Sequence, residues 1–320
     1  MKSKTTVRTA TILLALALLG ATASAGTSLR FFLPISRGMA GGSFSKLLDK
    51  LAVKLGETTG FSIDYVEEPY TLGFRVNDIT FKQMKAGNAD ITYVNSLEYV
   101  EEEKKWDGLF VPAFTLIVNK TYYNEFCMYA KKGSGIKSVA GSRGKVWGGM
   151  NTVPTRLLLH ENGIDEPLAK FFSSTKFVNE SPVTNLIDAQ AAGDMDVFTA
   201  IKGQMELSGG GSSAVPAAGG AEKKNQPITY ETIACTEGDH GWIFGFNRKV
   251  PQEAILKITK SITSVHSDKN FSEFQFMFMA IKGKFAKFNP ENLKRTREIA
   301  ALKKKLGWDK EMAEFFKKAK

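Results

Sequence analysis

Short polar loops directly follow several apolar runs, and their side chains are of the types that bind small ligands. Asn95 and Ser96 follow the run 89–94, and Asn151 and Thr152 follow the run 145–149. Amides and hydroxyls can donate hydrogen bonds to a ligand oxygen, and ligands of open α/β sheets bind beyond the carboxyl ends of strands. The alternative for both pairs is an N-cap of the next helix. The same rule selects Ser36, Arg37, Tyr93, Thr155, Arg156, Ser181, Thr184 and Thr236 as further ligand-binding candidates.

The inventory of catalytic groups is poor. The three histidines are His160, His240 and His266, and none is spaced with another His, Cys or Asp as a metal site requires. The sequence contains no Gly-x-Ser-x-Gly elbow, Walker loop or Cys-x-x-Cys motif. We therefore expect a binding protein that is not an enzyme, without a cofactor and without a metal.

The N-terminus has the order of a secretory signal peptide. Lys2, Lys4 and Arg8 precede a short apolar run over 10–19, and Ala23-Ser24-Ala25 supplies small residues for cleavage. The alternative, a membrane anchor, would need about 20 apolar residues. We expect cleavage after Ala25 and a periplasmic or otherwise extracytoplasmic protein. The mature chain of roughly 300 residues is long enough for two lobes of domain size.

The positive charge is concentrated at one end. The formal net charge is +10, and the segment 282–320 holds 13 Lys+Arg against 5 Asp+Glu. This distribution argues against a general nucleic-acid binder. The segment could dock on an acidic partner or on anionic lipid, or it could be the solvated face of a helix.

Cys127 and Cys235 are the only cysteines. An exported protein meets an oxidising compartment, where the two could form one bridge. The alternative is a pair of buried free thiols, since both lie in apolar, strand-like runs.

Strand-like and helix-like patterns alternate along the chain. The helical spacing of Phe44, Leu47, Leu48, Leu51 and Leu55 predicts an amphipathic helix. Strands are expected over 29–33, 61–66, 89–94, 126–130, 145–149, 175–178, 195–199, 229–235 and 241–247, and helices over 79–86, 154–161, 185–192 and the remainder after Pro251. This alternation favours an α/β fold with a parallel sheet. A Gly/Ser-rich insertion at 207–225 interrupts it.

Four stretches carry a resemblance to a known family. They are 85–94, which is similar to a family strand "N-G-x-x-D-I-A-Y"; 134–146, similar to "S-G-I-K-S-L … G-K-x-V"; 153–165, similar to "V-P-R-x-L-L … A-G-I"; and 191–197, similar to "L-x-x-G-x-V-D-A". In this order and spacing the chain resembles the phosphate/phosphite/phosphonate-binding periplasmic proteins of ABC transporters, which have the type 2 periplasmic binding protein fold.

The resemblance implies two α/β lobes, each a mostly parallel sheet flanked by helices, with a ligand cleft between them. Lobe one would be 26–125 plus 240–320, and lobe two 126–239, with 126–130 and 241–247 as crossing strands. The implied function is capture of a small oxyanion by interlobe closure and delivery to an ABC permease in the cytoplasmic membrane. The family's Ser/Thr-rich loop before its "V-P-R" helix is shortened here to Asn151-Thr152. The ligand thus stays open, as do a TRAP-type or sensory receptor and an exported scaffold that has lost its ligand.

Overall fold

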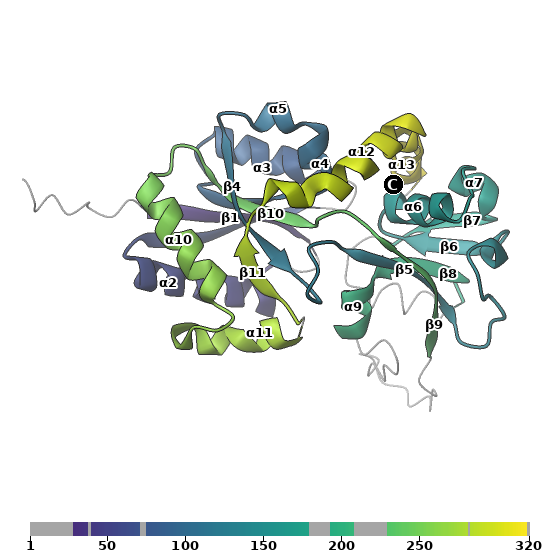
Figure 1. Ribbon diagram of the computed structural model, residues 1–320, viewed down its shortest axis with the longest axis horizontal. Helices are drawn as coiled ribbons and strands as arrows, with labels where there is room; N and C mark the ends of the chain where they lie inside the picture. The colour runs from purple at the N-terminus through teal and green to yellow at the C-terminus, as the bar shows by residue number, and fades with distance from the viewer. Residues whose placement is uncertain are drawn as a thin grey trace, which may run out of the picture.

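A computed structural model describes residues 28–37, 40–70, 75–178, 193–207, 229–280 and 282–318. These residues form two β-sheets that lie side by side, each flanked by helices (Figure 1). We call each sheet with its helices a lobe. The predicted α/β fold with two lobes is therefore confirmed.

The first sheet has the strand order β11-β4-β10-β3-β1-β2. Its strands are β1 (Ser28–Ser36), β2 (Ser62–Tyr70), β3 (Ile91–Asn95), β4 (Phe110–Ile117), β10 (Trp242–Asn247) and β11 (Lys284–Lys287). Its helices are α2 (Ser43–Thr59), α3 (Val76–Lys85), α4 (Ser96–Glu101), α5 (Glu103–Trp106), α10 (Gln252–Ser264) and α11 (Gln275–Ala280), with 3₁₀ turns η2 (Lys269–Phe274) and η3 (Pro290–Leu293).

Both faces of this sheet are buried. Phe31 and Tyr93 pack against apolar residues of α2 and α10 on one face, whereas Phe32 and Val94 pack against α3, α4 and α5 on the other. Successive side chains of a strand point to opposite faces, so burial of both faces requires the nearly continuous apolar runs seen in β1 and β3.

The second sheet has the order β7-β6-β8-β5-β9. Its strands are β5 (Glu125–Lys131), β6 (Val146–Gly149), β7 (Ser174–Phe177), β8 (Val197–Ile201) and β9 (Tyr230–Glu237), and its helical segments are η1 (Ala140–Ser142), α6 (Thr152–Glu161), α7 (Leu168–Phe171) and α9 (Lys202–Leu207). Met128 and Trp147 pack with α6 and α7, and Tyr129 and Phe198 pack on the opposite face.

Both sheets are mixed, which corrects the expectation of mostly parallel sheets. The pairs β1–β2, β1–β3, β6–β7 and β6–β8 are parallel, but every described pair that involves β4, β5, β10 or β11 is antiparallel. In the first sheet the chain returns through β10 and β11 to pair with β3 and β4, and in the second sheet β5 runs opposite to its neighbours β8 and β9. Two strands were not expected: β4, and β11 within the segment predicted to be helical.

The chain passes between the sheets twice near the centre of the molecule, from β4 to β5 and from β9 to β10. The two passages are bonded to each other, because the Asn124 amide donates to the Asp239 carbonyl (2.8 Å) and the Gly238 amide donates to the Asn124 carbonyl (2.7 Å). The predicted strands 126–130 and 241–247 therefore lie within the sheets, and the crossing backbone precedes each of them.

The last two helices do not belong to one lobe. α12 (Lys294–Lys305) packs on α4 of the first lobe, and α13 (Trp308–Lys318) packs on α6 and β7 of the second (Figure 1). The division of the chain expected from the sequence, with 240–320 wholly in lobe one, does not describe α13. Apolar packing holds α13 on the second lobe, because Phe315 of α13 is buried against Trp147 and Phe177 of the second sheet.

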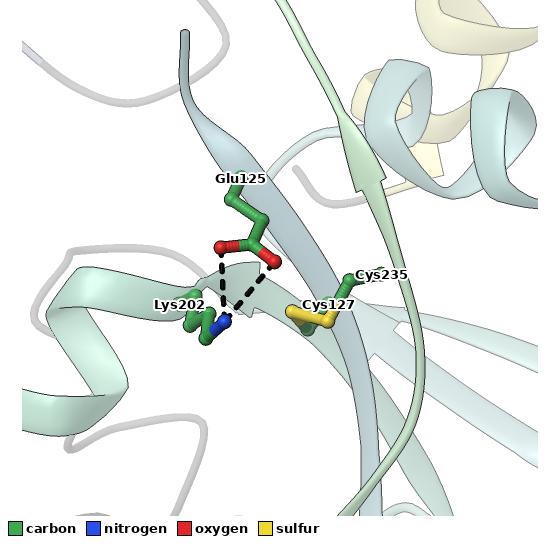
Figure 2. Close-up of a disulfide and its surroundings, with 4 residues drawn as sticks. All are labelled: Glu125, Cys127, Lys202 and Cys235. Atoms are coloured by element: carbon green, nitrogen blue, oxygen red, sulfur yellow. Dashed lines mark hydrogen bonds and ion pairs between the residues drawn. A yellow bond between two sulfur atoms is a disulfide. The ribbon is translucent and has the colours of Figure 1, made fainter. Parts of the chain in front are cut away.

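A disulfide joins Cys127 on β5 to Cys235 on β9 (Figure 2). The two residues are direct partners in the antiparallel register, with a Cα–Cα distance of 4.0 Å. Beside the bridge, Glu125 and Lys202 form an ion pair with an N–O distance of 3.0 Å (Figure 2). Of the two alternatives left open by the sequence, the structure has the bridge.

Candidate functional site between the lobes

A cavity of about 90 Å³ lies between the lobes, beside the crossing backbone. It is lined from both sheets, from the crossing segment and from the C-terminal helices. The lining residues are Asn95, Leu97, Glu98, Glu101, Phe126, Asn151, Val153, Pro154, Leu157, Gly238, Asp239, Ile299, Lys303 and Met312. Two predicted ligand-binding residues, Asn95 from the first lobe and Asn151 from the second, thus line one cavity.

Asn151 stands at the N-terminus of α6. Its side-chain oxygen accepts a hydrogen bond from the Val153 amide (2.9 Å), so it is the N-cap of this helix. Two residues earlier, Gly149 leaves room for the Trp147 ring, since a Cβ there would lie 2.4 Å from that ring. In the first turn of α6 the Val153 N–H is bonded to Asn151 and Pro154 has no N–H, so this helix end can offer an anion the Thr152 N–H and the positive end of the helix dipole.

Thr152 follows the cap and is fully buried. Its hydroxyl has no hydrogen-bond partner among the described residues. A buried hydroxyl without a partner is costly, which makes it the one predicted site residue with a free polar atom at the end of α6.

Asn95 has the corresponding place in the first lobe. Its side chain accepts from the Glu98 amide (3.1 Å) and caps α4, and its own amide donates to Asn77 Oδ1 (2.7 Å). The next residue, Ser96, is buried, and its hydroxyl lies 3.5 Å from Asp239 Oδ2. Capping and lining the cavity are therefore compatible for both asparagines.

The cavity is also acidic. Burial raises the pKa of Glu98, although its carboxylate accepts from the Asn77 amide (3.0 Å). Burial likewise raises the pKa of Asp239, which accepts from Asn124 Nδ2 (2.9 Å). Lys303 supplies the positive charge of the lining, and its ammonium lies 2.6 Å from Glu101.

Arg156 is placed elsewhere. Its side chain is 2% exposed, its Nη2 donates to the Asp165 carbonyl (2.8 Å), and its Nε lies 3.2 Å from Glu311 of α13. Its guanidinium also lies over the Trp308 ring. These contacts hold α6 to the loop that follows it and to α13, so the proposed site does not include Arg156.

Thr155 lies on the buried face of α6, where its hydroxyl donates to that of Thr199 (2.9 Å). The Trp147 indole donates to the same Thr199 oxygen (3.1 Å). This network fixes α6 on its sheet and does not line the cavity.

The other predicted residues are dispersed. The Tyr93 hydroxyl donates to the Pro34 carbonyl (2.8 Å), and its ring packs on Trp242 and Phe244. Thr236 is buried on β9, and Arg37 is exposed after β1. Ser36 ends β1. Ser181 and Thr184 lie outside the described residues.

Sequence reasoning missed the charged part of the lining. Glu98 lies outside every helix range that the sequence predicted, and Lys303 lies in a lysine-rich segment. Asp239 lies directly before the strand expected over 241–247, and this place was a usable signal.

In the described part of the chain, one group of potential metal ligands lies close together, namely Glu125, Cys127 and Cys235. Both of its sulfurs are consumed by the disulfide, and metal binding requires thiolates.

Comparison with solved structures identifies the class of fold. PhnD1 from Prochlorococcus marinus, solved in complex with methylphosphonate, superposes with a TM-score of 0.62 at 12% identity over 88% of this chain and 98% of that one. A binding-protein component of an ABC phosphonate transporter from Pseudomonas aeruginosa gives 0.61 at 14% identity over 87% and 88%. The aliphatic sulphonate-binding protein SsuA from Escherichia coli gives 0.53 at 12% identity over 87% and 92%.

The chain therefore has the fold of the two-lobed periplasmic binding proteins of ABC transporters. Two of these neighbours are binding proteins, and the third was solved with a small ligand. No protein-family model matches the chain, and no curated protein has a significantly similar sequence. Among the described helices, none is long and apolar enough to cross a membrane.

Proposed function

We propose that this chain is an extracytoplasmic solute-binding protein that captures a small ligand between its lobes and delivers it to an ABC importer. The observation that carries the proposal is the interlobe cavity, where the N-caps of α4 and α6 come from different lobes. A ligand held there contacts both lobes. It therefore stabilises the closed arrangement, in which residues of both lobes contact it at once. Export through the predicted signal peptide fits this role.

For the ligand we propose an oxyanion of the phosphate, phosphite or phosphonate type. The support is the N-terminus of α6, where the Thr152 N–H and the positive end of the helix dipole favour negative charge. The side-chain amide of Asn151, which lines the cavity, adds a donor at this end. Methylphosphonate and sulphonates are ligands of proteins with the same fold.

A second candidate is an oxyanion that also carries an amino group. Glu98 and Asp239 line the same cavity, and a carboxylate is a natural acceptor for an ammonium. Such a ligand would place its anionic end at α6 and its amine at these carboxyls.

A thermal-shift screen of the mature protein tests the proposal. Methylphosphonate, phosphate, phosphite, an alkanesulphonate and 2-aminoethylphosphonate would each be added in excess. A ligand at 100 times its dissociation constant stabilises the protein by about 2.7 kcal/mol. A shift with the aminophosphonate alone would favour the second candidate, and no shift with any compound would favour a scaffold that has lost its ligand.

Asn151→Asp is the diagnostic variant. Aspartate caps helices as well as asparagine does, but its charge would repel an oxyanion at α6. The variant should fold normally and lose the shift. Asn289→Asp is the matched control, since Asn289 caps η3 in the same way and is exposed away from the cavity; it should keep the shift.

A further inference from the structure

The helices α12 and α13 form a continuous connection from one lobe to the other. α12 packs on α4, and α13 packs on α6 (Figure 1). Gly307 joins them with a left-handed φ of +69°. Apart from the two central crossings, this is a third covalent path between the lobes, and it lies on the α4–α6 side.

Lys303 attaches this helix pair to the first lobe. Its side chain is 5% exposed, and its ammonium lies 2.6 Å from Glu101 of α4 and 2.6 Å from Asp309 of α13. A lysine is rarely buried unless it is paired. The lysine thus links the end of α4 to both C-terminal helices.

Glu311 attaches the pair to the second lobe. One of its oxygens lies 3.2 Å from Nε of the buried Arg156 on α6, and the other accepts the Leu168 amide at the start of α7. Arg156 also stacks over Trp308, the first residue of α13. The second lobe is therefore held by charge, backbone and ring contacts together.

An apolar cluster fills the space between these two attachments. It contains Leu97 of α4, Val153 and Leu157 of α6, Ile299 of α12 and Trp308 of α13. Four of the five are at most 5% exposed. Because the cluster takes residues from both lobes and from both C-terminal helices, separation of the lobes on this side would expose it.

Arg295 of α12 adds a polar contact to the same seam. It pairs with Glu161 at the end of α6, and its Nε donates to the Glu237 carbonyl (3.1 Å) just before the crossing backbone. Thr296 of the same helix accepts the amide of His240 (2.9 Å) within that crossing. The helix pair therefore contacts the crossing backbone as well as both lobes.

We propose that α12 and α13 form an interlobe strap, in which Lys303 and Glu311 hold the lobes together on the α4–α6 side and limit how far they separate. A strap that biases the lobe arrangement also sets ligand affinity, because affinity falls with the fraction of molecules in the competent arrangement. This second consequence rests on the proposed function, whereas the strap itself does not.

The strap can be tested without ligand by pulsed electron paramagnetic resonance. Nitroxides would be placed at the exposed positions Val53→Cys in the first lobe and Lys137→Cys in the second. Lys303→Met and Glu311→Gln are the test variants. Lys305→Met is the matched control, because Lys305 is an exposed lysine at the end of the same helix.

We expect a single distance distribution in the wild type and in Lys305→Met. Lys303→Met and Glu311→Gln should add a longer-distance population, with at least about a tenfold rise in the ratio of separated to strapped molecules. Circular dichroism checks folding, and the isosteric Glu311→Gln decides the matter if Lys303→Met fails to fold. A wild-type distribution in a folded test variant would overturn the strap.

Titration with methylphosphonate separates this result from the proposed function. If both hold, Glu311→Gln changes its dissociation constant and Lys305→Met does not; Lys303→Met is left out of this comparison, because Lys303 lines the cavity itself. A longer-distance population in a protein that binds no phosphonate would retain the strap and count against the proposed ligand.

Discussion

Removal of the Cys127–Cys235 bridge should strongly destabilise the second lobe. The two cysteines are 108 residues apart in sequence, and they join β5 to β9, the first and last described strands of the second sheet in chain order. In the chain-entropy description, closing a loop of this length removes about 16 cal/mol/K from the unfolded state, which is about 4.8 kcal/mol at 25 °C. Each kcal/mol shifts the melting temperature of a protein of this size by about 2–4 °C.

Urea and thermal unfolding of the oxidised wild type and of the double variant Cys127→Ala/Cys235→Ala measure this effect. We expect the melting temperature of the variant to fall by at least about 10 °C. Reduced wild type is the control, since it loses the bridge but keeps both side chains, and it should match the variant closely. Two free thiols in the untreated, denatured wild type would refute the reasoning, as would equal stability of the oxidised and reduced forms.

Three further predictions concern pH, packing and export. Burial lowers the pKa of His240 to about 4, so its contribution to stability is complete above about pH 6.5 and is lost as the pH falls toward 4. His240→Phe should therefore lessen the loss of unfolding free energy between pH 7.5 and 4.5 by about 2–3 kcal/mol, measured by urea titration at both pH values. Gly245→Ala should lower the free energy of unfolding by about 1–3 kcal/mol, because its Cβ would lie 2.3 Å from the Val111 carbonyl oxygen. An unchanged urea midpoint would contradict this and show that β4 shifts to make room for the methyl group. N-terminal sequencing of the exported protein should begin at Gly26, and an intact Met1 would contradict the predicted cleavage.

The elements that the sequence predicted well are those whose pattern is local. The spacing of Leu48, Leu51 and Leu55 follows one face of a helix, and these residues do pack α2 on its sheet. Likewise, strands buried on both faces, such as β1 and β3, are recognisable in the sequence as short apolar runs bounded by turns.

The strand pairings could not be predicted in the same way. β11 has only four residues, and it is held to β4 through Phe285, which packs against Phe114, Phe244 and Phe278. Those contacts join distant parts of the chain, so no local sequence pattern predicts them. The mixed character of both sheets has the same non-local origin.

The site was predicted in part for a geometric reason. The rule that ligands lie beyond strand ends led to Asn95 and Asn151, and both line the cavity. It also led to Arg156, but helical periodicity does not reveal that α13 covers that face of α6. For Lys303, the partner Glu101 lies 202 residues away, so a buried ion pair was indistinguishable from a solvated lysine-rich face.

The central claim, that a ligand is held between the lobes, is tested most directly by calorimetric titration of one variant from each lobe. Asn95→Asp and Asn151→Asp both preserve a helix cap while adding a negative charge to the cavity. Methylphosphonate, which carries no amino group, should bind the wild type and Asn289→Asp with one site, and each of the two cavity variants should weaken binding at least about tenfold. Unchanged affinity in both cavity variants, or weakening in only one of them, would contradict a ligand that bridges the lobes.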